Sequence, residues 1–138
     1  MLKSKDITKL KEKWDYCRFS KGAQLRVKRS LYYHHGIFTG ESVIHFGEGN
    51  SEQDLNSPQT NKVTECTLQE FLQGGMPEVR IYSRKEKKLL LPADEIVSRA
   101  KASLGNGGYD FLTNNCEHFS NYCAFGVAYS PQADTIKK

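Results

Sequence analysis

The stretch Tyr32-Tyr33-His34-His35-Gly36-Ile37-Phe38, followed after Thr39-Gly40-Glu41 by Ser42-Val43-Ile44-His45-Phe46, decides the fold of this chain. Two short apolar segments flank a glycine, and this pattern predicts a β-hairpin in which Gly40 supplies the turn. Just before it, the residues from Ala23 to Lys28 alternate between apolar and polar, with the period of two that a half-buried strand shows. The sequence therefore predicts an antiparallel sheet built around this hairpin.

Three of the four histidines of the chain lie in the hairpin. If its loop holds an even number of residues, the side chains of His34 and His45 fall on the same face of the ribbon. With a two-residue loop they would be directly opposite each other, with Cβ atoms roughly 5 Å apart. An odd loop with a bulge would change this arrangement. His35 is expected to face the other way, because neighbouring residues on a strand point to opposite faces.

Beyond the hairpin, we expect strands in the first part of the chain and helices in the last part. The pattern predicts one domain of the α+β class, with an antiparallel sheet packed against helices. The other expected elements are strands at Val63–Cys66 and Val79–Ser83, an exposed loop at Glu48–Asn61, a short helix or turn at Thr67–Leu72, a helix from Pro92 to Gly105, and a last helix through about Phe125 that Asn114 or Asn115 caps.

The N-terminal segment carries the pattern of a short helix. Ile7, Leu10 and Trp14 recur at helical spacing with lysines between them, which predicts a basic amphipathic helix from Ser4 to about Tyr16. Residues 1–18 are therefore assigned to this helix and residues 19–138 to the catalytic domain. Packing against the domain is its expected role, and lying on a membrane surface is the alternative.

The composition is that of a globular chain. Its 138 residues carry 20 basic and 16 acidic side chains, a net charge of +4, and the basic residues are scattered rather than gathered on one stripe. This distribution argues against a nucleic-acid partner. The sequence has no apolar run of the about 20 residues that cross a bilayer, and its first residues are charged where a signal peptide is apolar. We therefore expect a cytoplasmic protein that works, at most, peripherally at membranes.

A second motif, Asn114-Asn115-Cys116-Glu117-His118-Phe119, lies at the predicted start of the last helix. A cysteine in the first turn of a helix meets the positive end of the helix dipole, which favours the nucleophilic thiolate. The same N–H groups can receive the negative oxygen of a tetrahedral intermediate. A histidine on a facing strand can take the thiol proton, and a second polar residue can orient that histidine. The two motifs together suggest a Cys/His hydrolase or transferase.

The other cysteines are not expected to form disulfides or metal sites. The chain has four cysteines and no Cys-x-x-Cys, and Cys116 with His118 lacks a second ligand pair, so neither a metal nor a cofactor is predicted. Cys123 is expected in the core, and Cys17 and Cys66 are expected to be inert buried thiols.

The hairpin resembles the H-box of the lecithin–retinol acyltransferase family, and Asn115-Cys116-Glu117-His118-Phe119 resembles its Asn-Cys-Glu-His-Phe box. The resemblance runs from about Phe19 to Phe125. It implies a circularly permuted relative of the papain-like NlpC/P60 fold.

The resemblance also implies roles for particular residues. Cys116 would be the nucleophile, His34 the base and His45 the residue that orients it, with Tyr32 and Asn115 near the oxyanion or substrate. Enzymes of the family pass an acyl chain from a phospholipid to the cysteine and then to an alcohol, an amine or water. Vertebrate relatives usually carry a hydrophobic anchor, and no such segment is recognised in this sequence. We also do not expect the insertion of retinol-specific members, so retinol is not carried over as acceptor.

Two other functions remain open. One is a peptidase or amidase of the wider NlpC/P60 group, although those enzymes normally place the cysteine before the histidine in the sequence. The other is a non-catalytic module, membrane-associated or protein-binding, that keeps both boxes as structure.

Overall fold

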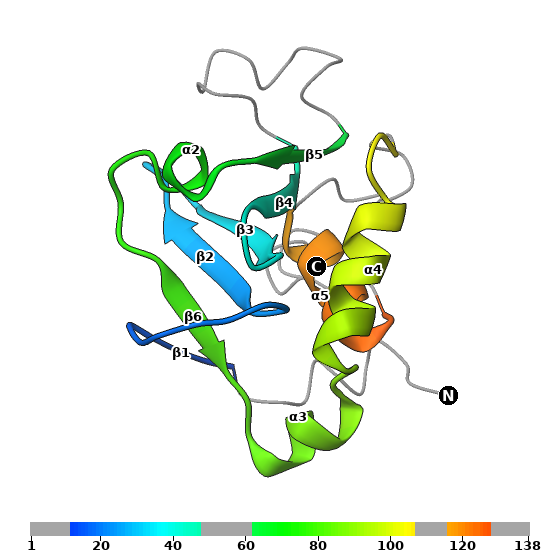
Figure 1. Ribbon diagram of the computed structural model, residues 1–138. Coiled ribbons are helices and arrows are strands. Elements are labelled where there is room, and N and C mark those ends of the chain that lie inside the picture. The colour runs from blue at the N-terminus through cyan, green and yellow to red at the C-terminus, as the bar shows by residue number, and fades with distance from the viewer. Residues whose placement is uncertain (1–11, 48–61, 107–115, 128–138) are drawn as a thin grey trace, which may run out of the picture.

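A six-stranded antiparallel sheet forms the centre of the molecule (Figure 1). The structure, a computed structural model, describes residues 12–47, 62–106 and 116–127. The strands are β1 (Lys13–Asp15), β2 (Gln24–Lys28), β3 (Tyr33–Phe38), β4 (Val43–Phe46), β5 (Val63–Cys66) and β6 (Glu78–Ile81). They lie side by side in the order β1-β6-β2-β3-β4-β5. This confirms the predicted α+β class with its antiparallel sheet, while the circular permutation remains a prediction.

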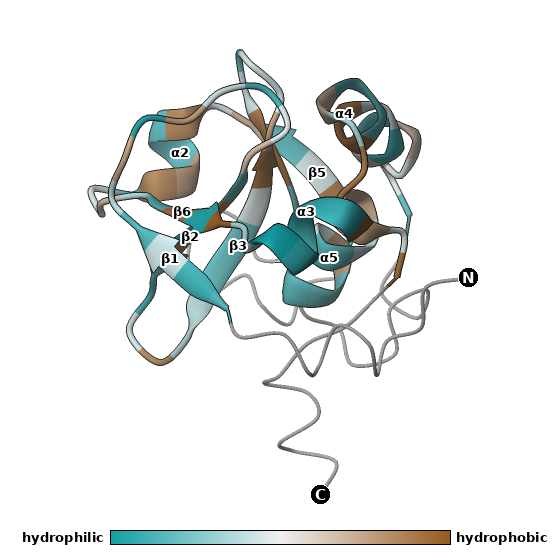
Figure 2. Ribbon diagram, turned by 90° about the horizontal axis from the view of Figure 1, so that it is seen from below, coloured by the Kyte–Doolittle hydropathy of each residue, from teal (hydrophilic) through white to brown (hydrophobic). Residues whose placement is uncertain are grey.

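Helices cover both faces of the sheet. The helices are α2 (Leu68–Leu72), α3 (Arg84–Leu89), α4 (Ala93–Ala102) and α5 (Cys116–Phe125). Figure 2 shows α2 and α4 each banded in apolar and polar colours, whereas α3 is predominantly polar. The apolar sides of α4 and α5 pack on Ile37, Ile44 and Phe46. Phe71 of α2 packs with Leu25, Val27 and Val43 on the opposite face.

Cap residues explain where these helices begin. Thr67 and Ser83 each accept a hydrogen bond from the backbone N–H of a glutamate three residues later, and that glutamate bonds back to the cap, so α2 and α3 both begin with a capping box. Pro92 stands at the N-cap of α4, as the sequence predicted. Helix α3 was not predicted, because its Arg84–Leu89 sequence has no apolar periodicity.

The hairpin loop differs from the prediction in its length. His45 pairs with Gly36 and Val43 pairs with Phe38, so the loop is Thr39–Ser42 and holds four residues. The loop is even, which confirms that His34 and His45 share a face. The directly opposite pairing was wrong, and the two residues are diagonal neighbours instead. The Thr39 side chain accepts a hydrogen bond from the Ser42 backbone N–H, which closes the longer loop.

The prediction of an N-terminal helix from Ser4 to Tyr16 is wrong for the part of this range that the structure describes. Lys13–Asp15 forms the edge strand β1, in which Lys13 pairs with Ile81 and Asp15 pairs with Val79 of β6. Pairing with an otherwise open sheet edge outweighs a weak helical pattern. The rest of that helix and the loop Glu48–Asn61 lie outside the described residues. The division of the chain at residue 18 stays a prediction.

The cysteine environments also differ in part from expectation. All four cysteines are free thiols; Cys123 is buried in the core as predicted, but Cys17 is exposed and Cys66 is half-buried. In the part of the chain that the structure describes, no helix is long and apolar enough to cross a membrane.

Candidate active site

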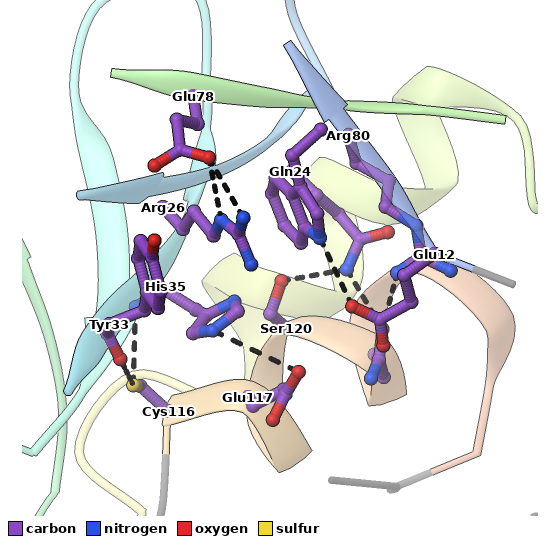
Figure 3. Close-up of polar contacts among 12 residues, drawn as sticks. Glu12, Gln24, Arg26, Tyr33, His35, Glu78, Arg80, Cys116, Glu117 and Ser120 are labelled. Atoms are coloured by element: carbon purple, nitrogen blue, oxygen red, sulfur yellow. Dashed lines mark hydrogen bonds and ion pairs between the residues drawn. The ribbon is translucent and has the colours of Figure 1, made fainter. Parts of the chain in front are cut away.

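The thiol of Cys116 lies where the β3–β4 ladder ends. That ladder stops at the pair Gly36 and His45, so the backbone of β3 beyond Gly36 has no partner in β4. The sulfur takes this place: the backbone N–H of His35 donates to Cys116 Sγ at 3.1 Å, and Sγ lies 3.7 Å from the carbonyl oxygen of Tyr33 (Figure 3). These two backbone groups belong to the residues on either side of His34. The first residue of α5 is therefore held against the strand at the position of His34.

The His34 ring points to the α2 face of the sheet and meets His45 there. His34 Nε2 lies 3.0 Å from His45 Nδ1, so one of these nitrogens donates a hydrogen bond to the other. The His34 ring also stacks at a tilt on Phe71, with ring centroids 5.3 Å apart. Gly36 makes this packing possible, since a Cβ atom there would lie 2.5 Å from Val43 Cγ1 and 2.8 Å from Phe71 Cε1.

Burial keeps both of these histidines neutral. Desolvation, followed by the charges of His45 and Arg29, lowers the pKa of His34 well below its usual value. Desolvation and Arg29 likewise lower the pKa of His45 to about 4. Two neutral imidazoles can form a single directed hydrogen bond, in which the acceptor nitrogen of one ring faces the N–H of the other. Because Nε2 of His34 faces His45, proton exchange with a neighbouring thiol would use Nδ1.

His35 points to the opposite face, towards α5. Its ring meets the edge of Trp14, with centroids 5.4 Å apart, and its Nε2 lies 3.9 Å from Glu117 Oε2. Desolvation, with Arg26 and Arg80 nearby, lowers the pKa of His35 to about 3. The ring is therefore neutral, and its contact with Glu117 is not an ion pair despite the short separation. Its Nδ1 is buried without a hydrogen-bond partner among the described residues.

A buried polar network fastens α5 to the sheet beside His35. The Gln24 side-chain amide donates to Ser120 Oγ at 2.8 Å (Figure 3) and to Asn121 Oδ1 at 3.0 Å. The Gln24 side-chain oxygen accepts from the Tyr82 hydroxyl at 2.8 Å. Arg80 forms a buried ion pair with Glu86 of α3. Buried hydrogen-bond networks of this kind favour one arrangement of the elements they join.

The structure brings together three of the five residues expected in the site. Cys116, His34 and His45 lie at the start of α5, in β3 and in β4. Tyr32 is half-buried in the turn before β3, where its carbonyl accepts from the Arg29 N–H at 2.7 Å, and Asn115 lies outside the described residues. Sequence reasoning missed the residues that hold α5 in place, because Gln24 and Ser120 are 96 residues apart and carry no local pattern.

Comparison with known proteins shows the family of the chain. The family model described as lecithin retinol acyltransferase matches residues 17–129, a range that contains both histidine strands and α5. The chain belongs to the lecithin retinol acyltransferase family.

Individual members of the lecithin retinol acyltransferase family cover most of the chain. The lecithin retinol acyltransferase of Mus musculus is 31% identical over 147 residues, which span 90% of this chain and 64% of that protein. The Bos taurus protein of the same name is 29% identical and covers 88% of this chain and 61% of its own length. Phospholipase A and acyltransferase 2 of Homo sapiens is 29% identical, over 80% of this chain and 74% of that protein. The chain thus spans less than two thirds of the lecithin retinol acyltransferases that it matches.

Proposed function

We propose that this protein is a thiol-dependent acyltransferase or acylhydrolase that takes an acyl chain from a phospholipid. One observation carries the proposal: the Cys116 sulfur is held by the two backbone groups that flank His34, while His45 bonds the far nitrogen of the His34 ring. A nucleophile, a base and a residue that orients the base are the parts that covalent acyl transfer requires. The names of the relatives, which include phospholipase A and acyltransferase, support the choice of substrate.

The first half of the reaction forms a thioester. His34 Nδ1 takes the proton of the Cys116 thiol, and the thiolate attacks an ester carbonyl of the phospholipid. The positive end of the α5 dipole and the N–H groups at the start of that helix stabilise the negative oxygen, and we assign Tyr32 to assist there. The intermediate collapses when the carbon–oxygen bond breaks, and the leaving lysophospholipid oxygen takes the proton from His34. The acyl chain is then bonded to Cys116.

The second half releases the acyl chain. An acceptor hydroxyl, amine or water gives a proton to His34 and attacks the thioester carbonyl. The carbon–sulfur bond breaks, and the Cys116 thiolate recovers its proton from His34. His45 holds the ring in the required orientation in both halves. Because both histidines are neutral at rest, the site begins each half ready to accept a proton. Such an enzyme would work peripherally, at the surface of the membrane that holds its substrate.

The test is the mass of the intact protein after incubation with a short-chain phosphatidylcholine. We expect an added acyl chain on the natural protein and none on Cys116→Ala, with the adduct accumulating in His45→Gln. Cys17→Ser is the matched control, because Cys17 is the exposed thiol and would be the one labelled by non-specific chemistry. If no adduct and no lysolipid form while the fold is intact, the proposal is wrong, and peptide amides become the next substrates to examine.

A further inference from the structure

Several elements of the sheet meet at one end of the molecule. Strand β1 ends at Asp15, opposite Val79 in β6, and β6 begins at Glu78, opposite Arg26 of β2. Strand β2 ends at Lys28, opposite Tyr33, where β3 begins. Because all these pairs are antiparallel, the end of β1, the start of β6, the end of β2 and the start of β3 lie at the same end of the sheet (Figure 1).

Exposed apolar side chains gather at this end. The large exposed hydrophobic residues of the described chain are Tyr16 at 63%, Leu31 at 92%, Met76 at 68% and Leu104 at 40%. Tyr16 follows β1, Leu31 lies in the turn between β2 and β3, and Met76 lies in the loop before β6. Leu104 follows α4, on the other side of the molecule (Figure 1). Single exposed apolar residues are common on soluble proteins, but three on adjoining loops at one end form a pattern.

Hydrogen bonds and close packing fix the two loops that carry Leu31 and Met76. The Arg29 N–H donates to the Tyr32 carbonyl at 2.7 Å and closes the turn, and Arg29 Nη2 donates to the Phe71 carbonyl at 2.8 Å. Gly75 lies so close to β2 that a Cβ atom there would be 2.7 Å from Val27 Cγ2. Leu31 and Met76 are therefore presented outward by packed segments.

The candidate active site lies near this end of the sheet. Cys116 Sγ contacts the backbone of Tyr33 and His35, at the beginning of β3. Leu31 lies only two residues before Tyr33 in the sequence. A surface that held Leu31 would hold the thiol close to the same surface.

We propose that the end of the sheet formed by Tyr16, Leu31 and Met76, with Lys28, docks onto a phospholipid bilayer; we call it the docking end. This inference rests on the proposed function, because a phospholipid substrate is what would bring the protein to a membrane. Leucine and methionine gain free energy by entering the acyl region, tyrosine suits the interface, and exposed Lys28 suits anionic headgroups. Of the acids here, Glu78 is paired with Arg26, and only Asp15 is exposed.

A bilayer fits this surface better than a protein partner does. The exposed apolar side chains stand on three separate segments, after β1, in the β2–β3 turn and before β6. A protein partner would need a complementary surface packed to interior density, whereas a fluid bilayer needs only protruding apolar groups.

The experiment is flotation with vesicles of phosphatidylcholine and phosphatidylserine. The test variant is Leu31→Ser with Met76→Ser, and the matched control is Leu104→Ser, an exposed apolar residue outside the docking end. We expect the double variant to lose vesicle binding by about tenfold or more, since two apolar side chains no longer enter the bilayer. The control variant should bind as the natural protein does. Turnover of a monomeric short-chain phosphatidylcholine should be unchanged in both variants, which also shows that each is folded.

A second measurement reports contact directly. Leu31→Trp should shift its fluorescence to shorter wavelength when vesicles are added, above the constant contribution of Trp14, and Leu104→Trp should not. The proposal is wrong if the natural protein does not bind vesicles, if the double variant binds as well as the natural protein, or if Leu104→Ser weakens binding equally. If no protein forms an acyl adduct but flotation follows the expected order, the proposed reaction fails and the docking end stands.

Discussion

The two faces of strand β3 show how neighbouring residues with the same side chain come to have different surroundings. On the α2 face, His34 lies among aromatic and aliphatic groups and bonds His45. On the α5 face, His35 lies beside Trp14, Arg26 and a network of buried polar groups. The first face holds the pair of bonded imidazoles beside the strand backbone that contacts the Cys116 sulfur. The second face uses its polar side chains to fix the helix that carries the sulfur. In the proposed function, the groups that react and the groups that support them are therefore separated by a single strand.

The largest expected effect is a difference in activity between variants of the two adjacent histidines. His34→Gln should lower the rate of acyl transfer by about 10²–10⁴-fold, because it removes the base, whereas His35→Gln should lower it by less than about tenfold. The measurement is kcat on a short-chain phosphatidylcholine, with circular dichroism to show that both variants fold. If His35→Gln were the more damaging change, the base would lie on the α5 face and the comparison would be reversed.

The next largest effect is expected in the unfolding free energies of variants on the two faces. Phe71→Ala empties a fully buried site on the α2 face and should cost about 3–5 kcal/mol of unfolding free energy. Gln24→Leu removes the buried hydrogen bonds that Gln24 makes with Ser120, Asn121 and Tyr82 and should cost about 1–3 kcal/mol. Urea denaturation measures both, and Gln69→Leu, at an exposed glutamine of α2, is the control. A Gln24→Leu variant as stable as the natural protein would show that apolar packing can replace the network.

The pH dependence of stability gives a smaller and graded effect. The pKa of His35 is about 3 in the folded chain and near 6.5 when unfolded, so the unfolded state binds more protons between these values. The contribution of His35 is therefore complete above pH 6.5 and is lost as the pH falls towards 3, by up to about 1.4 kcal/mol per pH unit. His34 and His45 add losses of the same sign. Unfolding free energies at several pH values should fall less steeply in His35→Gln; an unchanged slope would contradict the burial of a neutral ring.

The smallest effect is expected away from both faces. Lys21 and Asp94 form an ion pair at the exposed start of α4, where solvent screens their charges. Asp94→Asn should change neither the thermal midpoint nor the rate of acyl transfer measurably. A clear loss of stability would mean that this surface contact supports the core more than its exposure indicates.

Much of this arrangement could be predicted from the sequence, and the exceptions have physical causes. The hairpin, α4 and α5 could be predicted because residue periodicity and helix-start signals are local. The length of the hairpin loop could not be predicted, because hydrogen bonds between Thr39 and Ser42 stabilise a loop of four residues instead of two. Helix α3 lacks an apolar stripe, but Ser83 followed by Glu86 is the capping-box signal that could have revealed it.

The residues proposed for the site could be identified from the sequence, whereas the contacts that support them could not. Cys116, His34 and His45 stand in recognisable motifs, and their residue types indicate a nucleophile with a base. The attachment of α5 through Gln24 depends on contacts between residues far apart in the chain, which no local pattern records. Edge strand β1 was missed for a similar reason, since its three residues become a strand only by pairing with β6.

The hydrogen bond from the His35 N–H to the Cys116 sulfur turns one backbone amide into a reporter of the charge on that sulfur. A thiol is a weak acceptor, and a hydrogen bond to an ionised acceptor is shorter and stronger. In an isotope-labelled sample, the amide proton resonance of His35 would move downfield when the thiolate forms and return upfield when the sulfur is acylated. A single nuclear magnetic resonance signal, in a chain without any added probe, would then follow the nucleophile through each stage of its cycle.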